Sequence, residues 1–169
     1  MVTKRMNLEE LEKIDSKKMY QTYDKWPEIA KDGFDNDFEK FDAKGIDNIV
    51  FSGMGGSGSI GDVISAILSK EDIHVSNVKG YHLPKTVDSN TLVISTSVSG
   101  NTKETLTVLE KAQKTDAKIA VFSSGGMIQK FSKTNNLFFQ EISMIHSPRA
   151  SFPKFLFTIL NILKEIIPI

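Results

Sequence analysis

The chain has 169 residues, of which 40% are hydrophobic and 25% are charged, a composition typical of a single globular domain. Its 21 basic and 21 acidic side chains leave no positive excess to neutralise a phosphate backbone, so we expect no nucleic-acid partner. The absence of cysteine excludes disulfides, thiolate nucleophiles and cysteine-ligated metal sites, and it fits a cytoplasmic protein. We expect neither a signal peptide nor a membrane span, because the N-terminus lacks an apolar core and the most apolar stretch, 152–163, is short.

Residues 1–44 are expected to form a helical extension that precedes the main domain. Asn7 and Glu10 have the spacing of a capping box, which predicts that a first helix begins there. A second helix is expected to begin near Trp26 and Pro27, since proline is tolerated in the first helical turn. Gly33 is a point at which this second helix can be interrupted, because glycine is unfavourable inside a helix. Four apolar residues of this segment are predicted to face a core: Ile29, Phe34, Phe38 and Phe41.

From Asn48 onward, short apolar runs alternate with segments of helical pattern. The predicted strands are 49–51, 73–78, 92–94, 119–122 and 137–139. The predicted helices are about 60–69, 103–114 and 127–134, with a last one from Pro153. Apolar strands joined through helices are typical of a parallel sheet that is covered on both faces. We therefore predict a single α/β domain over 45–169, a three-layer, doubly wound sheet of five parallel strands.

The first of two loops suited to an anion follows the predicted strand 49–51 and reads Gly-Met-Gly-Gly-Ser-Gly at 53–58. Its glycines let the backbone turn sharply and bring free amides close to a ligand at a helix N-terminus. The spacing also matches the dinucleotide fingerprint, but the acidic residue that binds the ribose is missing from the end of the next strand, 78–81. No lysine follows the glycines as a P-loop requires. A dinucleotide-binding oxidoreductase is therefore our last-ranked hypothesis.

The second loop, 95–102, follows another apolar strand and leads into a predicted helix. It places several hydroxyl groups beside a helix N-terminus, where backbone amides are unpaired and the helix dipole is positive. Hydroxyls and amides together can bind a phosphate without lysine or arginine. The alternative is an ordinary capping box formed by Asn101 and Glu104 in a serine-rich turn. Two such loops after strands of one sheet favour a phosphate site.

Four segments carry a resemblance to a known family: Gly53–Gly58, Ser97–Thr105, Ser123–Gly126 and Pro148–Ala150. On these segments the chain resembles the SIS superfamily, and it is most similar to the N-terminal half of the archaeal bifunctional phosphoglucose/phosphomannose isomerases. The resemblance implies a flavodoxin-like strand order and a hexose 6-phosphate ligand. It also implies metal-independent interconversion of glucose 6-phosphate or mannose 6-phosphate with fructose 6-phosphate through an enediol, with no cofactor.

The resemblance also assigns roles to individual residues. Three hydroxyl side chains are implied to bind the substrate phosphate: Ser97, Ser99 and Thr102. Three residues of the glycine loop are implied to line the sugar site: Gly55, Gly56 and Ser57. Arg149 is implied to stabilise the developing enediolate, which suits a guanidinium that stays charged and donates a fork of hydrogen bonds. Val98 departs from the pattern, since the family usually has tyrosine there.

Length is the second departure, because family members have two SIS domains in tandem and this chain matches only the first. In the family, the glutamate that acts as base and the histidine that opens the sugar ring belong to the second domain. The local candidates are Glu104, Glu141 and His146; Glu104 is better explained as a helix-start residue, and we favour a structural or solvated role for His146. We therefore expect the domain to bind sugar phosphate with little isomerase turnover. The alternative is a stand-alone SIS module that senses a sugar phosphate.

The predicted last helix has almost no polar face over 152–163, and a helix that is apolar all round is expected to be buried on both sides. We therefore predict that a second SIS domain or a second copy of the chain packs against it, most simply as a homodimer. The sequence leaves the preference between glucose and mannose substrates open.

Overall fold

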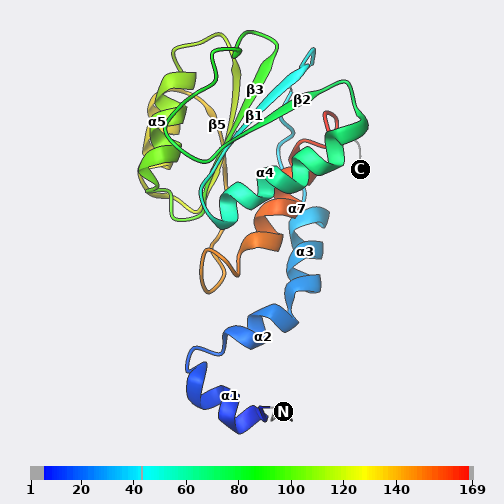
Figure 1. Ribbon diagram of the computed structural model, residues 1–169, viewed down its shortest axis with the longest axis vertical. Coiled ribbons are helices and arrows are strands. Elements are labelled where there is room, and N and C mark those ends of the chain that lie inside the picture. The colour runs from blue at the N-terminus through cyan, green and yellow to red at the C-terminus, as the bar shows by residue number, and fades with distance from the viewer. Residues whose placement is uncertain (1–5, 43, 168–169) are drawn as a thin grey trace, which may run out of the picture.

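The structure is a computed structural model that describes residues 6–42 and 44–167. Its centre is a sheet of five parallel strands in the order β2-β1-β3-β4-β5 (Figure 1). The strands are β1 Asn48–Ser52, β2 His74–Val78, β3 Thr91–Ser97, β4 Lys118–Ser123 and β5 Phe138–Glu141. The prediction of a doubly wound, five-stranded parallel α/β fold with flavodoxin-like order is confirmed.

Helices cover both faces of the sheet because successive residues of each strand point to opposite sides. The helices of the domain are α4 Gly56–Ile67, α5 Lys103–Ala112, α6 Gly126–Thr134 and α7 Phe152–Ile162, and a 3₁₀ turn, η1 Leu68–Lys70, follows α4. Ile49 and Phe51 of β1 face the core that is shared with α4 and α7. Val50, between them in sequence, faces the core that is shared with α5 and α6. The domain therefore has two hydrophobic cores, one on each side of the sheet.

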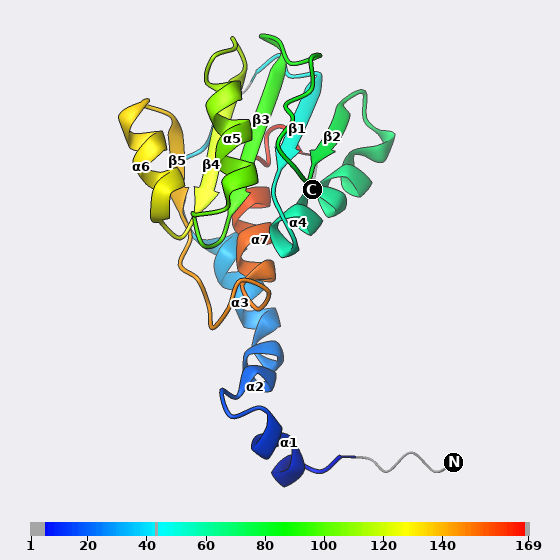
Figure 2. The same ribbon diagram turned by 60° about the vertical axis from the view of Figure 1, so that its left-hand side comes forward.

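Three helices precede the sheet: α1 Leu8–Ile14, α2 Met19–Asp24 and α3 Trp26–Asp35. The first two project away from the sheet domain (Figure 2), and neither contains a buried residue. The predicted capping box is confirmed, since Asn7 Oδ1 accepts the Glu10 N–H at 2.8 Å and Glu10 Oε2 accepts the Asn7 N–H at 3.1 Å. The sequence analysis missed α2. Its start is stabilised by the Asp15 carboxylate, which accepts the Tyr20 N–H at 2.9 Å.

The prediction for the second helix was wrong at its end. Gly33 does not interrupt α3, but the helix stops at Asp35, so Phe38 and Phe41 lie in the segment that follows it. Both are half-buried against the core on the α7 side. Gly33 itself is buried, and a Cβ atom there would lie 3.0 Å from the Lys154 carbonyl oxygen. The missing side chain allows α3 to pack closely on α7.

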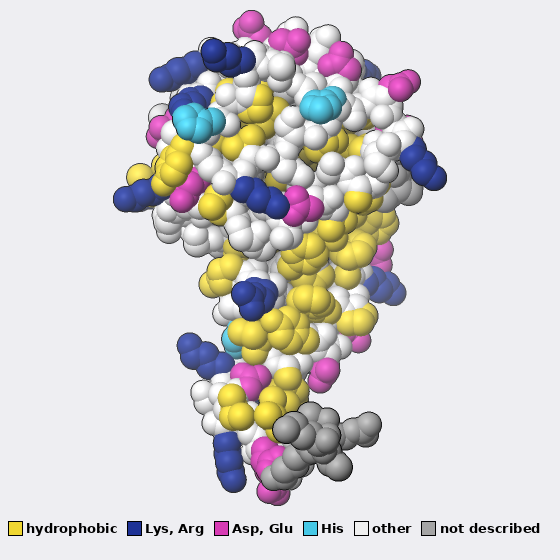
Figure 3. Space-filling model, viewed as in Figure 1, with side chains coloured by type: hydrophobic (Ala, Val, Ile, Leu, Met, Phe, Trp, Pro, Cys, Tyr) yellow, Lys and Arg dark blue, Asp and Glu magenta, His cyan; other side chains and the backbone are white. Residues whose placement is uncertain are grey.

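The apolar character of α7 is explained within the chain and not by a partner. Phe155 and Ile159 are fully buried in the core that α7 shares with α4 and the sheet, and on α3 and the segment after it the Phe34 and Asn36 carbonyl oxygens accept from Asn161 Nδ2 at 2.7 Å. Our reason for expecting a second domain or copy at α7 was therefore wrong, and the homodimer stays a prediction without that support. Three exposed apolar side chains lie in α1 or just before it: Met6, Leu8 and Ile14. Figure 3 shows hydrophobic side chains along the helices that project from the sheet domain.

Two chemical features are absent from the described part of the chain. None of its helices has the length and hydrophobicity that a membrane span requires. Residues 6–42 and 44–167 also contain no group of three or more His, Asp or Glu side chains arranged to hold a metal ion.

Candidate functional site

The strand order creates a switch point between β1 and β3. These strands are neighbours, with Ser52 paired in register with Ser95, but β1 leads to α4 on one face and β3 leads to α5 on the other. In open parallel sheets, ligands bind beyond the carboxyl ends of the strands at such a point. The two loops that the sequence analysis singled out are the two loops that leave it.

The glycine loop after β1 exposes its backbone where α4 begins. Gly55, the residue before α4, has a φ of +54°, and a Cβ atom there would meet nothing within 4 Å. Gly56 is likewise exposed, whereas Ser57 is only 8% exposed. Gly53 serves packing, because a Cβ atom on it would lie 2.9 Å from the Ser57 carbonyl carbon. Of the three predicted sugar-site residues, Gly55 and Gly56 are therefore accessible and Ser57 is largely covered.

The hydroxyl loop after β3 brings two of its three predicted phosphate ligands into contact. Ser97 Oγ and Thr102 Oγ1 are 2.9 Å apart, and Ser97 Oγ also accepts the Gly100 N–H at 3.1 Å. Ser99 is exposed at the turn. Thr102 occupies the N-cap position of α5, but its side chain does not cap the helix. The first turn of α5 therefore keeps amides with no side-chain cap at the positive end of the helix dipole.

The alternative of a capping box formed by Asn101 and Glu104 is wrong. Asn101 Oδ1 instead accepts the Met127 N–H at the start of α6 at 3.1 Å, and its Nδ2 donates to the Ser99 carbonyl oxygen at 3.1 Å. Glu104 hydrogen-bonds to Tyr81, and desolvation together with the Glu104 carboxylate raises the pKa of Tyr81 above its usual value. Asn101 thus ties the hydroxyl loop to α6, and Glu104 ties the start of α5 to the segment after β2. Short-range sequence patterns reveal neither role.

A third loop, 123–126 after β4, supports the hydroxyl loop. Ser123 Oγ donates to the Ser97 carbonyl oxygen at 2.6 Å, and the Ile128 N–H donates to the Gly100 carbonyl oxygen at 2.9 Å. Gly100 has a φ of +69°, and a Cβ atom there would lie 1.8 Å from the Gly125 carbonyl oxygen. Close backbone packing therefore fixes the conformation of the hydroxyl loop.

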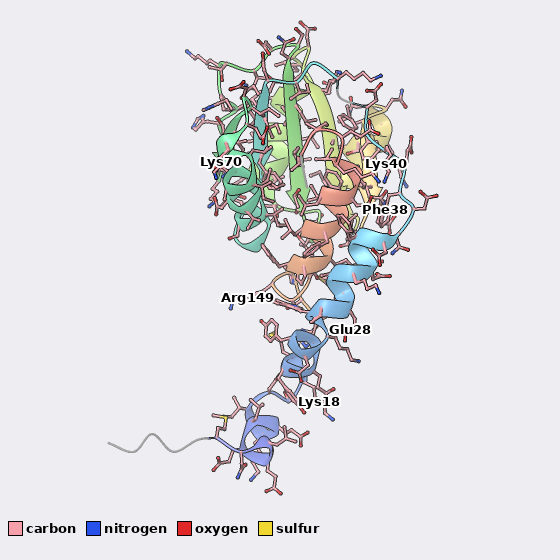
Figure 4. The ribbon with its side chains drawn as sticks, turned by 90° about the vertical axis from the view of Figure 1, so that its right-hand side faces the viewer. Lys18, Glu28, Phe38, Lys40, Lys70 and Arg149 are labelled. Carbon is pink, nitrogen blue, oxygen red and sulfur yellow. The ribbon has the colours of Figure 1, made fainter. Side chains whose placement is uncertain are left out.

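Arg149 lies in the loop 142–151 between β5 and α7, and its side chain is exposed. A Cβ atom on Gly56 would lie 4.0 Å from the Arg149 Cα atom, so this loop passes directly beside the glycine loop. Figure 4 shows the Arg149 side chain projecting outward near the start of α3. The structure thus brings together residues that are far apart in the sequence.

The three local candidates for a general base all have other hydrogen-bond partners. His146 Nε2 lies 3.1 Å from the Lys17 carbonyl oxygen, and Glu141 Oε2 accepts a bond from Gln129 Nε2 at 3.0 Å. Glu104 is bonded to Tyr81 as described above. These contacts agree with structural roles for the three side chains.

Comparison with known proteins identifies the family. The SIS domain model matches residues 44–141. The bifunctional phosphoglucose/phosphomannose isomerase of Thermoplasma acidophilum is 45% identical over 83 residues, covering 49% of this chain and 26% of that protein. The corresponding enzyme of Aquifex aeolicus is 38% identical over 138 residues, covering 78% and 43%. The D-glucosamine-6-phosphate 4-epimerase of Sulfolobus acidocaldarius is 31% identical over 143 residues, covering 84% and 44%.

The chain thus spans less than half the length of these relatives. Solved structures extend the likeness to the fold. A protein of E. coli CFT073, solved as a complex, matches with a TM-score of 0.62 at 18% identity, covering 93% of this chain and 88% of that one. The sugar isomerase domain of an RpiR transcription factor from Sphaerobacter thermophilus matches with a TM-score of 0.56 at 15% identity, covering 92% and 86%. Because the SIS domain model matches more than half of its residues and the curated relatives are 31–45% identical, the chain belongs to the SIS domain family.

Proposed function

We propose that the chain is the sugar-phosphate-binding SIS domain of a phosphoglucose/phosphomannose isomerase and that its ligand is a hexose 6-phosphate. The observation that supports this most is the hydroxyl loop at the uncapped start of α5. Relatives of two different activities, an isomerase and an epimerase, have names that contain a phosphorylated hexose. Enzymes of these two activities both need a domain that binds a phosphorylated sugar. A place in cytoplasmic hexose phosphate metabolism is part of the same proposal.

The phosphate is proposed to bind at the hydroxyl loop. Ser97, Ser99 and Thr102 form the hydroxyl side of the site, in which Ser99 and one member of the Ser97–Thr102 pair donate to the phosphate, and the first amides of α5 donate from the backbone. Because Ser97 and Thr102 already share a hydrogen bond at 2.9 Å, one hydroxyl proton of the pair remains available for the ligand. The cross-bonds to the loop 123–126 hold these donors in place before the ligand arrives, which reduces the entropy lost on binding.

The sugar is proposed to lie over the exposed backbone of Gly55 and Gly56, toward Arg149. Aldose–ketose isomerisation removes a proton from C2 of the aldose, or from C1 of the ketose, and leaves negative charge on the neighbouring oxygens. The Arg149 guanidinium can donate two hydrogen bonds to these oxygens and stabilise the enediolate. We assign the base and the ring-opening group to a second SIS domain, because the acid–base side chains nearby are engaged elsewhere.

The second candidate function is a stand-alone module that senses a sugar phosphate. The likeness to the RpiR domain is a likeness of fold at 15% identity, and it favours sensing no more than it favours catalysis. Both functions use the same phosphate site.

Titration calorimetry with fructose 6-phosphate tests the site. The 169-residue chain should bind weakly, and the Ser97→Ala/Ser99→Ala double variant should lose at least about tenfold in affinity, because it removes the Ser99 donor and the hydroxyl pair that Ser97 forms with Thr102. Ser69→Ala, at an exposed serine in η1, is the matched control and should bind as the parent chain does. Unchanged affinity in the double variant would rule out this phosphate site.

A further inference from the structure

We infer that the N-terminal extension positions Arg149 and that Trp26 is the residue through which it does so. The inference rests on the proposed function of Arg149 as the group that binds the reacting end of the sugar. Trp26 is the first residue of α3, far from the glycine and hydroxyl loops in sequence. It is a positioning residue, because it touches the main chain beside Arg149 and not the ligand.

The central contact joins the indole of Trp26 to the loop that carries Arg149. Trp26 Nε1 donates to the Ala150 carbonyl oxygen at 3.0 Å. Ala150 is fully buried, whereas its neighbour Arg149 is exposed. A hydrogen bond to the main chain restrains the backbone from which the arginine projects. Trp26 is itself held in place by Tyr23, whose ring meets the indole edge to face with centroids 4.9 Å apart.

A second contact joins the extension to the same loop. His146 Nε2 lies 3.1 Å from the Lys17 carbonyl oxygen, in the turn between α1 and α2. His146 has a φ of +55°, a left-handed conformation that residues other than glycine rarely adopt. Ser151 Oγ accepts the Ile145 N–H at 2.8 Å and so closes the loop at its base. The unfavourable backbone conformation is thus held by bonds at the base of the loop and from the extension.

The N-terminal extension and the Arg149 loop both lie outside the segment 44–141 that the SIS domain model matches. The contact between them continues along α3 and α7, because Lys154 Nζ of α7 lies 2.8 Å from Asp32 Oδ2 of α3. The Arg149 loop in turn passes beside Gly56 of the glycine loop. A chain of contacts therefore runs from the extension through Trp26 and Ala150 to the place where the sugar is proposed to bind.

The matched ligands for the test are an acyclic sugar-acid phosphate and inorganic phosphate. The sugar-acid phosphate, whose carboxylate imitates the enediolate, should bind both the hydroxyl loop and Arg149. Inorganic phosphate should bind the hydroxyl loop alone. Loss of the Trp26 hydrogen bond should therefore weaken the first ligand about three- to tenfold, as expected for one hydrogen bond, and leave the second within about twofold.

Two variants remove the donor. Trp26→Phe keeps an aromatic ring without the N–H group. Because Trp26 is the only tryptophan of the chain, it can also be replaced globally by its benzothiophene analogue, which keeps the shape of the indole and substitutes sulfur for N–H. This second form keeps the inference testable if the phenylalanine variant folds poorly. Glu28→Gln, at an exposed position in the first turn of α3, is the control, because Glu28 forms no hydrogen bond or ion pair with the loop 142–151 among the described residues.

A double-mutant cycle shows whether Trp26 acts through Arg149. The loss caused by the Trp26 replacement should disappear in an Arg149→Met background. Additive losses, or an unchanged affinity for the sugar-acid phosphate, would overturn the inference.

Amide hydrogen exchange separates this result from failure of the proposed function. If no variant binds any phosphosugar, faster exchange in 143–151 but not in 97–102 on loss of the indole N–H would still support Trp26 as the positioning residue, and unchanged exchange would refute it.

Discussion

Gly100 determines the conformation of the hydroxyl loop at the level of a single residue. Its φ of +69° lies in the left-handed region, and the space that a side chain would need is taken by the Gly125 carbonyl oxygen. Gly126, at the end of the loop 123–126, packs against Gly100 in turn, since a Cβ atom on Gly126 would lie 2.8 Å from the Gly100 carbonyl carbon. Glycine on both sides lets the two loops pack backbone against backbone.

We predict that Gly100→Ala destabilises the domain by about 3 kcal/mol or more, because it combines backbone strain with a collision. At about 2 to 4 °C per kcal/mol, the midpoint of thermal unfolding should fall by about 6 to 12 °C, measured by calorimetry. Gly80→Ala is the control, since a Cβ atom there meets nothing within 4 Å and should change the midpoint little. Equal midpoints for Gly100→Ala and the parent chain would show that the two loops do not pack this way.

At the scale of elements, the pairing of α3 with α7 ties the extension to the sheet domain. The side-chain hydrogen bond from Lys154 is the largest cause that lowers the pKa of Asp32, followed by the bond from Asn36. A carboxyl whose pKa is lower in the folded state stabilises the fold at pH values above its unfolded pKa of about 3.8. That contribution is lost as the pH falls through the lowered pKa of the folded state.

The corresponding prediction concerns Asp32→Asn. At pH 7 it should lower the unfolding midpoint by about 1 to 3 °C, since the Asp32 side chain is half exposed and such pairs contribute about 1 kcal/mol or less. As the pH falls below 3.8 and through the lowered pKa of the folded state, the difference from the parent chain should shrink, because Asp32 becomes protonated. Asp35→Asn on the same helix is the control, since Asp35 forms no ion pair among the described residues. A difference that grows with acidification would contradict this account.

The centre of the sheet was predictable from sequence because β1, β3 and β4 are buried on both faces and read as continuous apolar runs such as 92–94. The two candidate loops could be singled out because glycine and hydroxyl residues stand directly after those runs. The end of α3 and the existence of α2 were not, since α2 has no buried residue and thus no apolar period. The burial of α7 also depends on α3, a contact between segments more than a hundred residues apart that no local pattern encodes.

For the whole molecule, the fold gathers the candidate site at one end of the sheet. The glycine loop, the hydroxyl loop and the Arg149 loop all follow the carboxyl ends of strands, and α1 and α2 extend from that same end (Figure 2). Arg149 was foreseen only through the family resemblance, and its support by Trp26 could not be read from the sequence. The predicted homodimer and the pairing with a second SIS domain stay open to test, and the exposed apolar side chains of the extension make it the surface to examine first.

Chemical-shift mapping tests the central claim, that the hydroxyl loop binds the phosphate of a sugar at the start of α5, most directly. The backbone amide signals of the ¹⁵N-labelled chain, which has a mass of 18.8 kDa, can be followed as glucose 6-phosphate is added. The account predicts that the largest shifts occur at the amides of 99–105, with smaller shifts in the glycine loop. Shifts confined to other parts of the chain, or no shift in 99–105 at saturation, would contradict it.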